Sequence, residues 1–248
     1  MDCLVTGGAG FIGSNLVDAL VVRGDRVTVI DNLSTGKREN LSAALARGAT
    51  LEIGDVCDAQ GVAAVFSAVR PQVVFHLAAQ IDVRHSVAQP ASDAAANVLG
   101  TIAVLEAARG VGAQRVVFAS TGGGLYGEAE LRPTPEDYPI RPLAPSGMGK
   151  YAGEGYCELY TRLHDLATVS LRYGNVYGPA PERPWRGRCG GDLLRLPDRS
   201  SDADRLRRRS PNAGLDRGLR CRIRQPRGGG LRSDRSGQHR SRARDGGA

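Results

Sequence analysis

The first 31 residues constrain the fold more than any other part of this chain. A buried apolar run (CLVT, residues 3–6) leads into a glycine-rich turn, and an apolar-periodic segment then predicts a helix over residues 11–24. A second strand (RVTVID, residues 26–31) follows and ends on an acidic residue. Two strands joined through a helix are expected to lie parallel, so this segment predicts an α/β domain.

The same alternation of strands and helices continues to residue 173. Further strands are predicted over 50–55, 72–79, 115–120 and 167–173, further helices over 59–69, about 90–110 and 150–164, and a proline-rich loop over 132–145. Such alternation predicts a doubly wound, parallel, Rossmann-like sheet.

The glycine-rich turn and the acidic residue after the second strand together predict a dinucleotide site. Without side chains, the turn lets the backbone approach a pyrophosphate in front of a helix N-terminus. Asp31 lies where a carboxylate binds the adenosine ribose hydroxyls and repels a 2′-phosphate, which favours NAD over NADP. Lys37 and Arg38 follow closely enough that NADP binding stays an alternative. The glycines of the turn are Gly7, Gly8, Gly10 and Gly13.

Composition changes abruptly after residue 178. Residues 179–248 hold 19 of the chain's 31 arginines and neither lysine, and they contain no Val, Thr, Phe, Tyr or Met. A segment so poor in large apolar residues cannot offset the entropy of ordering itself. We therefore divide the chain into an NAD-binding Rossmann-like domain at 1–178 and a disordered, Arg-rich tail at 179–248, with no recognisable substrate domain.

The motifs of the first 179 residues resemble those of UDP-glucose 4-epimerases, NAD-dependent nucleotide-sugar epimerases of the extended short-chain dehydrogenase/reductase class. They follow the family's order: TGGAGFIG (6–13), Asp31 with Asn32, GDV (54–56), HLAAQ (76–80), Asn97, FASTGGGLYGE (118–128), a PxGxxK frame ending at Lys150, and LRYGNVYGP (171–179). The resemblance implies a UDP-glucose/UDP-galactose type isomerase in which NAD transiently oxidises C4 of the UDP-sugar substrate.

The resemblance also implies which residues bind the cofactor. His76 and Leu77, judged from the residues alone, are more typical of core and strand-end positions. The implied set is Gly7, Gly10, Phe11, Ile12 and Gly13 at the pyrophosphate, Asp31 and Asn32 after the second strand, Asp55 and Val56 at the adenine, Leu77, Ala78, Ala79 and Gln80 at the central region, Asn97, and Lys150 and Tyr173 near the nicotinamide riboside.

Three residues are candidates for catalysis: Thr121, Ser146 and Lys150. Thr121 matches the family hydroxyl that hydrogen-bonds the sugar 4-OH, and it lies at the C-terminal end of a predicted parallel strand, where ligands bind. Lys150 matches the family lysine that binds the nicotinamide ribose and lowers the pKa of a tyrosine four residues earlier on the same helix face. Asn175 would contact the sugar nucleotide.

The chain departs from the family at that tyrosine, because Ser146 stands in its place. A phenol of pKa about 10 can be tuned to accept a proton near neutrality, whereas an aliphatic hydroxyl is far less acidic and shorter. Tyr151 lies on a different helix face, and Tyr126 is expected in the loop after Thr121. We therefore expect this chain to be inactive or strongly impaired.

Specific residues argue for or against other functions. Sugar-nucleotide dehydratases of this fold carry an Asp-Glu pair where this chain has Gly122 and Gly123, which argues against dehydration. Ser146 leaves open a non-catalytic NAD-binding protein. The basic tail would be attracted to nucleic-acid phosphate, but its charges are scattered, so no specific nucleic-acid partner is expected.

Location and assembly follow from composition and resemblance. The five cysteines lack metal-ligand spacing, and no apolar run approaches the roughly 20 residues of a membrane span. We expect a reduced, cytoplasmic protein without a metal or a membrane. The resemblance implies a homodimer formed through two sheet-flanking helices.

The break in composition predicts a shifted reading frame, caused by one extra base in the codons for Pro179 and Ala180. Read one base later, the codons for residues 181–187 can give QNAHGEA, which resembles the family's continuation into a substrate domain. An Arg-rich, lysine-poor stretch is also what a GC-rich gene yields in a wrong frame. The alternative is a native disordered basic tail, and the nucleotide sequence of the gene distinguishes the two.

Overall fold

The computed structural model of this chain describes residues 1–178, which form one parallel sheet of six strands in the order β3-β2-β1-β4-β5-β6. The predicted Rossmann-like fold is confirmed, and the predicted disorder of 179–248 lies outside the described residues. The strands are β1 (Asp2–Thr6), β2 (Arg26–Asp31), β3 (Thr50–Ile53), β4 (Val73–His76), β5 (Arg115–Thr121) and β6 (Ala167–Tyr173).

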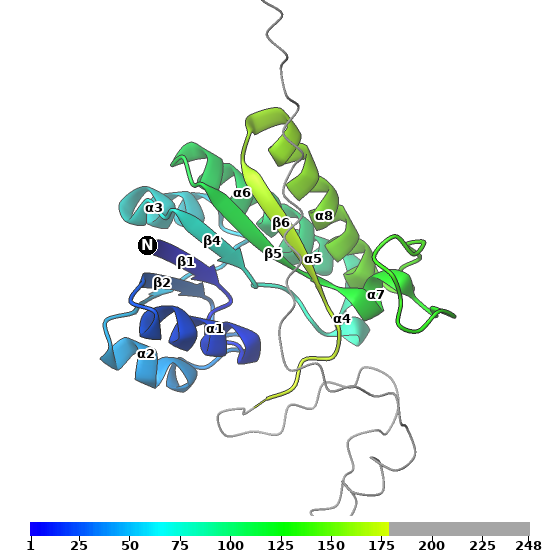
Figure 1. Cartoon of the computed structure of the whole chain (residues 1–248), viewed down its shortest axis with the longest axis horizontal. Helices are drawn as coiled ribbons and strands as arrows, with labels where there is room; N and C mark the ends of the chain where they lie inside the picture. Colours follow the sequence, from blue (N-terminus) through cyan, green and yellow to red (C-terminus); the bar gives the residue numbers. More distant parts are fainter. Residues whose placement is uncertain (179–248) are drawn as a thin grey trace, which may run out of the picture. The chain divides into compact units, whose positions relative to one another are not determined.

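Helices cover both faces of the sheet (Figure 1). On one face α1 packs with α2, and on the other α3, α6 and α8 pack side by side. The helical elements are α1 (Phe11–Val22), the 3₁₀ turn η1 (Arg38–Leu41), α2 (Ser42–Ala46), α3 (Ala59–Val69), α4 (Val83–Ala88), α5 (Pro90–Ala94), the π-helical turn η2 (Ala95–Leu99), α6 (Gly100–Gly110), α7 (Gly122–Tyr126) and α8 (Pro145–His164). No described helix is long and apolar enough to cross a membrane.

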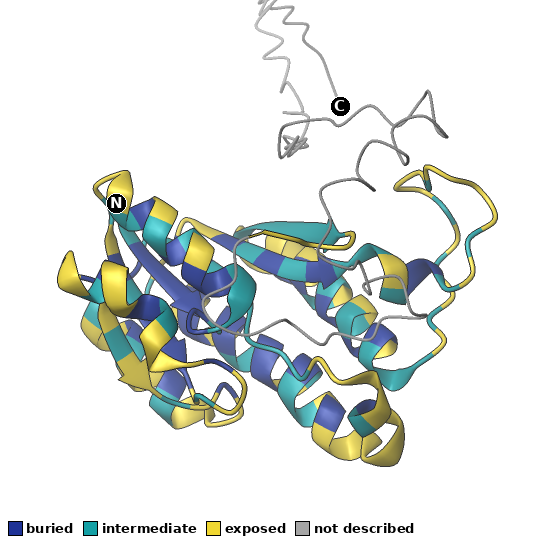
Figure 2. Ribbon diagram, turned by 90° about the horizontal axis from the view of Figure 1, so that it is seen from below, coloured by how far each residue is buried: buried dark blue, intermediate teal, exposed yellow. Residues whose placement is uncertain are grey.

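Two apolar cores hold these layers together, and the buried residues of Figure 2 follow the inner strands and the helix faces turned toward them. The first joins Phe66 of α3, Leu105 of α6 and Phe118 of β5, all with no exposed surface. The second packs Val17 of α1 against Val29 of β2. Near-continuous apolar strands are expected where a parallel sheet is covered on both faces.

The sheet is covered less completely at β6. This strand ends the sheet, so within residues 1–178 its outer edge has no neighbouring strand. All seven of its residues are partly exposed, in contrast to β1, where four of five are buried.

Several predicted boundaries were wrong. The last long helix begins at Pro145, inside the predicted loop, because proline at the first helical position needs no hydrogen-bond partner for its nitrogen. Tyr126 lies in the short helix α7 and not in a loop. The predicted helix at 90–110 is continuous but widens into a π turn at Ala95–Leu99, and the strands predicted over 50–55 and 72–79 end at Ile53 and His76.

Candidate nucleotide and sugar site

The predicted site residues gather at the carboxyl ends of the strands. The strand order changes direction between β1, which precedes the glycine turn, and β4, which leads into Leu77–Gln80. In open parallel sheets, ligands bind in the crevice at such a switch point. Thr121 ends β5 and pairs in register with Tyr173, which ends β6. Asn175 follows β6 and is exposed.

The glycine turn brings bare backbone to the start of α1. Gly7 has φ +69°, and a Cβ atom there would lie 2.6 Å from the Ala78 nitrogen. At Gly13, a Cβ atom would lie 2.2 Å from the Gly7 carbonyl oxygen. Gly10 is the N-cap of α1 and forms no side-chain cap, so the first N–H groups of the helix, at Phe11 and Ile12, have neither a side-chain cap nor a partner within the helix. This is the form of a pyrophosphate cradle.

Asp31 ties the end of β2 to the glycine turn. Its buried carboxylate accepts hydrogen bonds from the backbone nitrogens of Ala9 (2.9 Å) and Leu33 (2.8 Å). Gly36, which sequence reasoning missed, lies against the same turn, where a Cβ atom would approach the Ala9 carbonyl carbon to 2.8 Å. The Lys37 nitrogen donates to the Ala9 oxygen at 3.1 Å. The sequence signal that could have identified Gly36 is its position five residues after Asp31.

The two candidate adenine contacts lie beside Asn32. The Asn32 amide donates to the Asp55 carboxylate at 2.9 Å. The other carboxylate oxygen accepts from the Cys57 nitrogen at 2.8 Å, and this backbone hydrogen bond is the main reason the pKa of Asp55 lies below its ordinary value. Val56 is buried under Gly100, where a Cβ atom would come within 2.8 Å of its side chain. Asn32, Asp55 and Val56 are thus brought together.

His76 is a core residue, as its position predicted, and it links the end of β1 to α6. Its Nδ1 lies 2.7 Å from the Thr6 hydroxyl and its Nε2 lies 3.1 Å from the Thr101 hydroxyl. The Thr101 hydroxyl donates to the Asn97 carbonyl, so Nε2 carries the ring proton and Nδ1 accepts from Thr6. The Thr6 oxygen in turn accepts from the Ala78 nitrogen at 3.2 Å. Thr6 and Thr101 were not predicted as site residues.

His76 is expected to make the chain acid-sensitive. Burial, with a further contribution from the charge of Lys150, lowers the pKa of His76 to about 3. The unfolded chain binds a proton there below about pH 6.5 and the folded chain does not, so stability is lost as pH falls. Between pH 7 and pH 5 the parent should lose about 2 kcal/mol more than His76→Gln in urea unfolding. Equal losses would show that the ring is protonated in the folded chain.

Gln80 and Asn97 form a second polar cluster above β4. Asn97 accepts from the Gln80 nitrogen and donates to the Gln80 oxygen, both at 3.0 Å. It sits in the π turn, and its amide also donates to Asp93 at 3.1 Å. Ala79 lies between Ala78 and Gln80, partly exposed. The turn after β4 is therefore held from both of its ends.

Thr121 and Lys150 lie at the end of β5. Thr121 caps α7 by accepting from the Gly124 nitrogen at 3.2 Å. Lys150 donates to the Ala119 carbonyl oxygen at 2.8 Å and lies 4.7 Å above the Phe118 ring. Burial lowers the pKa of Lys150 to about 8, against the opposing influence of Cys157 and Asp93.

Ser146 lies one turn before Lys150 on α8 and is partly buried. The backbones of α7 and α8 touch here, because a Cβ atom on Gly147 would lie 2.4 Å from the Gly124 oxygen. Residue 146 is thereby brought to the turn that follows Thr121. Ser120 was missed, although its hydroxyl is buried and has no hydrogen-bond partner among residues 1–178. The described part of the chain contains no cluster of three metal-ligating side chains.

Comparison with known proteins identifies similar sequences. A family model described as the NAD dependent epimerase/dehydratase family matches residues 3–188. The UDP-glucose 4-epimerase of Mycolicibacterium smegmatis is 47% identical over 182 residues, which are 72% of this chain and 57% of that protein. The putative UDP-glucose 4-epimerase of Methanocaldococcus jannaschii is 45% identical over 175 residues, 71% of this chain and 56% of that protein.

Solved structures agree with the fold. The UDP-glucose 4-epimerase of Thermotoga maritima, solved with UDP-glucose, has a TM-score of 0.69 and 46% identity, covering 73% of this chain and 57% of that one. The UDP-glucose 4-epimerase of Thermus thermophilus, solved with NAD, has a TM-score of 0.68 and 47% identity, covering 72% and 57%. This chain therefore spans a little over half the length of these relatives.

Proposed function

Because the chain belongs to the NAD dependent epimerase/dehydratase family, we propose that residues 1–178 are the NAD-binding half of a UDP-sugar 4-epimerase. The observation that carries this proposal is the convergence of the glycine turn, Asp31, Thr121 and Lys150 at the carboxyl ends of the strands. A relative with the same fold was solved with NAD and another with UDP-glucose, which supports both ligand classes.

The residues present fit the cofactor. The cradle at Gly7 and Gly13 would be filled by any Cβ atom, and the uncapped start of α1 offers N–H groups to a pyrophosphate. Asp31 would accept from the adenosine ribose, Asp55 and Val56 would border the adenine, and Leu77 to Gln80 would line the central region. Lys150 and Tyr173 would lie at the nicotinamide riboside.

The proposed reaction explains the residues at the end of β5. When bound, NAD would supply reversible hydride transfer at C4 of the sugar; the hydride taken from C4 would be returned to the other face, so that no net redox change would occur. Thr121 would hydrogen-bond the 4-OH, and the Lys150 ammonium would hold the ribose. Ser146 offers no phenol to take the 4-OH proton, so we propose that this chain binds its ligands but turns over poorly or not at all. A non-catalytic NAD-binding protein is the second candidate, and it is favoured by Ser146 alone.

Asp31→Asn tests the cofactor half directly. We expect NADH affinity of the full chain to fall at least about tenfold, because a charged hydrogen bond to the ribose is weakened. The preference for NADH over NADPH should narrow, since the charge that repels a 2′-phosphate is gone. Fluorescence titration measures both. Asp165→Asn is the matched control, because it lies in the left-handed cap of α8, where asparagine is tolerated. Unchanged NADH binding in Asp31→Asn would disprove the ribose assignment.

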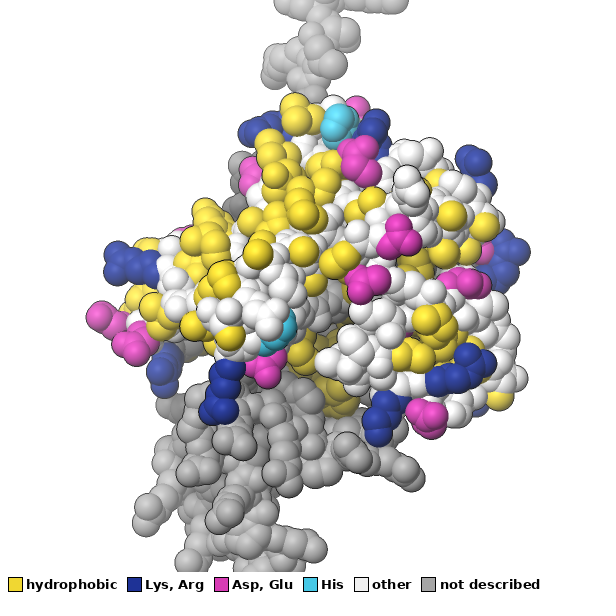
Figure 3. Space-filling model, turned by 180° about the vertical axis from the view of Figure 1, so that it is seen from behind, with side chains coloured by type: hydrophobic (Ala, Val, Ile, Leu, Met, Phe, Trp, Pro, Cys, Tyr) yellow, Lys and Arg dark blue, Asp and Glu magenta, His cyan; other side chains and the backbone are white. Residues whose placement is uncertain are grey.

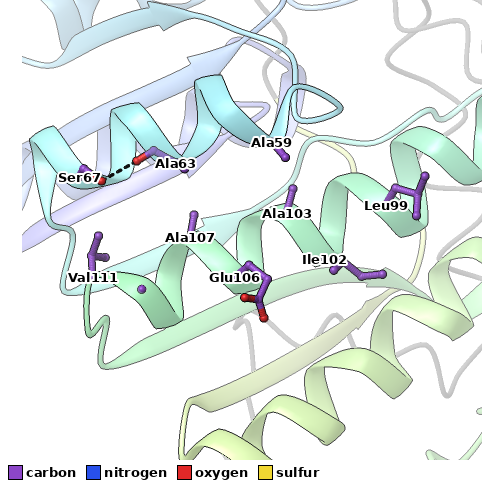
Figure 4. A pocket seen from close by; sticks show the side chains of 10 residues that line it. Ala59, Ala63, Ser67, Leu99, Ile102, Ala103, Glu106, Ala107 and Val111 are labelled. Atoms are coloured by element: carbon purple, nitrogen blue, oxygen red, sulfur yellow. Dashed lines mark hydrogen bonds between the residues drawn. The ribbon is translucent and has the colours of Figure 1, made fainter.

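Assembly as a homodimer is also proposed. A hollow of about 410 Å³ lies between the outer faces of α3 and α6 and is lined by small and apolar side chains such as Ala63, Ala103 and Ile102 (Figure 4). Leu99, at its rim, is 62% exposed. The family resemblance implies a dimer through two sheet-flanking helices, and α3 and α6 are such a pair.

Location and other partners remain proposals. The described cysteines Cys3, Cys57 and Cys157 are free thiols, which supports a reducing, cytoplasmic location. On the face seen in Figure 3, basic and acidic side chains are both scattered, mostly toward its edges, and form no continuous basic patch, a pattern that does not favour nucleic-acid binding. The nucleic-acid alternative depends on the basic segment at 179–248, which lies outside the described residues, as does the proposed frameshifted remnant of a substrate domain.

A further inference from the structure

The carboxylate of Asp93 is buried close to the site without a charged hydrogen-bond partner in the described chain. Asp93 lies on α5 and is 1% exposed. Its Oδ1 accepts from the side-chain amides of Gln80 (2.9 Å) and Asn97 (3.1 Å). A neutral amide oxygen could accept both hydrogen bonds, and burying a charge is costly unless a cation faces it. The charge of Asp93 therefore needs an explanation beyond these two amides.

The other carboxylate oxygen faces α8. A Cβ atom on Gly149 would lie 3.4 Å from Asp93 Oδ2 and 3.0 Å from the Asn97 Cβ. The absence of a side chain at Gly149 thus lets α8 come down onto Asp93 and Asn97. The residue that follows Gly149 is Lys150, so the position of this lysine depends on that contact.

Lys150, the residue after Gly149, is the cation next along the chain from this contact. The lysine is partly buried, its ammonium lies over the Phe118 ring and donates to the neutral carbonyl of Ala119, and it forms no ion pair with the described residues. The titratable groups that act on it are Asp93 from α5 and Cys157 from α8, while His76 from β4 is neutral. A thiol that is itself buried stays protonated, since burial raises the pKa of Cys157 to about 12. Asp93 is then the one negative charge among these groups.

We propose that Asp93 is a positioning residue for Lys150. It joins the turn after β4 to α8 at Gly149, the residue before Lys150, and so places a buried carboxylate near that lysine. The assignment rests on the proposed function only for the role of Lys150 toward the nicotinamide ribose. It adds to the site a residue that touches neither ligand but acts through Gln80, Asn97 and Lys150.

The test uses the small number of lysines in the chain. Lys37 and Lys150 are the only two, so the full protein labelled with ¹³C at lysine Cε gives two resonances whose pH midpoints can be followed separately. In Asp93→Asn, which keeps the shape of the side chain, the Lys150 midpoint should fall by at least about 0.5 unit. The Lys37 midpoint should not move. Glu106→Gln removes a carboxylate that bonds Tyr160 of α8 and should leave Lys150 unchanged.

An unchanged or raised Lys150 midpoint in Asp93→Asn would overturn the proposal. If Asp93→Asn does not fold, the double variant with Lys150→Met decides, because removing both charges leaves no uncompensated ion. The double variant should then regain folding, and failure to regain it would also overturn the proposal. The measurement needs no cofactor. A fallen Lys150 midpoint in a chain that does not bind NADH would refute the proposed function and leave the pairing of Asp93 with Lys150 standing.

Discussion

A chain with Ser146→Tyr and a reading frame restored after codon 180 should interconvert UDP-glucose and UDP-galactose, whereas the same restored chain that keeps Ser146 should be about 10²–10⁴-fold slower. The reason is the missing phenol, since residue 146 lies one helical turn before Lys150 and next to the turn after Thr121. Nuclear magnetic resonance of the sugar anomeric proton measures turnover without coupling enzymes.

The single repair Ser146→Tyr in the chain as it stands should give no detectable turnover. The relatives are nearly twice as long as the part matched here, and the covering domain that would complete the sugar site is expected in that remainder. Activity of the single repair would show that this domain is dispensable. Early stop codons in the frame one base on after codon 180 would refute the frameshift and make residues 179–248 a genuine part of the protein.

Gly13→Ala should abolish NADH binding and destabilise the chain by about 3 kcal/mol. The new methyl group would lie 2.2 Å from the Gly7 oxygen and 2.7 Å from the Gly8 Cα, and both are backbone atoms that cannot rotate away. The turn must therefore open, and the close approach of Gly7 to Ala78 would then be lost.

Gly155→Ala is the matched control for Gly13→Ala. Gly155 lies inside α8, is exposed, and has no atom within 4 Å of the Cβ position. The same methyl group should there stabilise the chain by about 1 kcal/mol through helix propensity and leave NADH binding intact. Urea unfolding and fluorescence titration measure both variants. Similar behaviour of the two variants would show that the glycine turn is not the tight cradle inferred here.

The sheet and the glycine turn could be predicted from the sequence because their signals are local. Apolar runs, glycine spacing and an acidic strand end lie within about 30 residues of one another and need no knowledge of distant contacts. The start of α8 at Pro145 was missed because proline reads as a loop residue as well as a helix start.

The polar network of the site could not be predicted, because it joins residues far apart in sequence. His76 meets Thr6 across 70 residues and Thr101 across 25. Asp93 belongs to none of the sequence motifs, and an acidic residue on a short helix is usually expected to face solvent. It becomes visible as a site residue only when Gly149 brings α8 against it.

The outer edge of β6 is expected to affect how much soluble protein is recovered during synthesis. Within the described chain no strand pairs with the outer side of β6, and such an edge is a template for strand addition by another molecule. Strand addition joins two molecules, so it becomes faster as the protein concentration rises. The soluble fraction should therefore fall as the expression rate rises, even though both apolar cores are intact. Chaperones that shield strand edges should therefore raise recovery more than substitutions that tighten the interior.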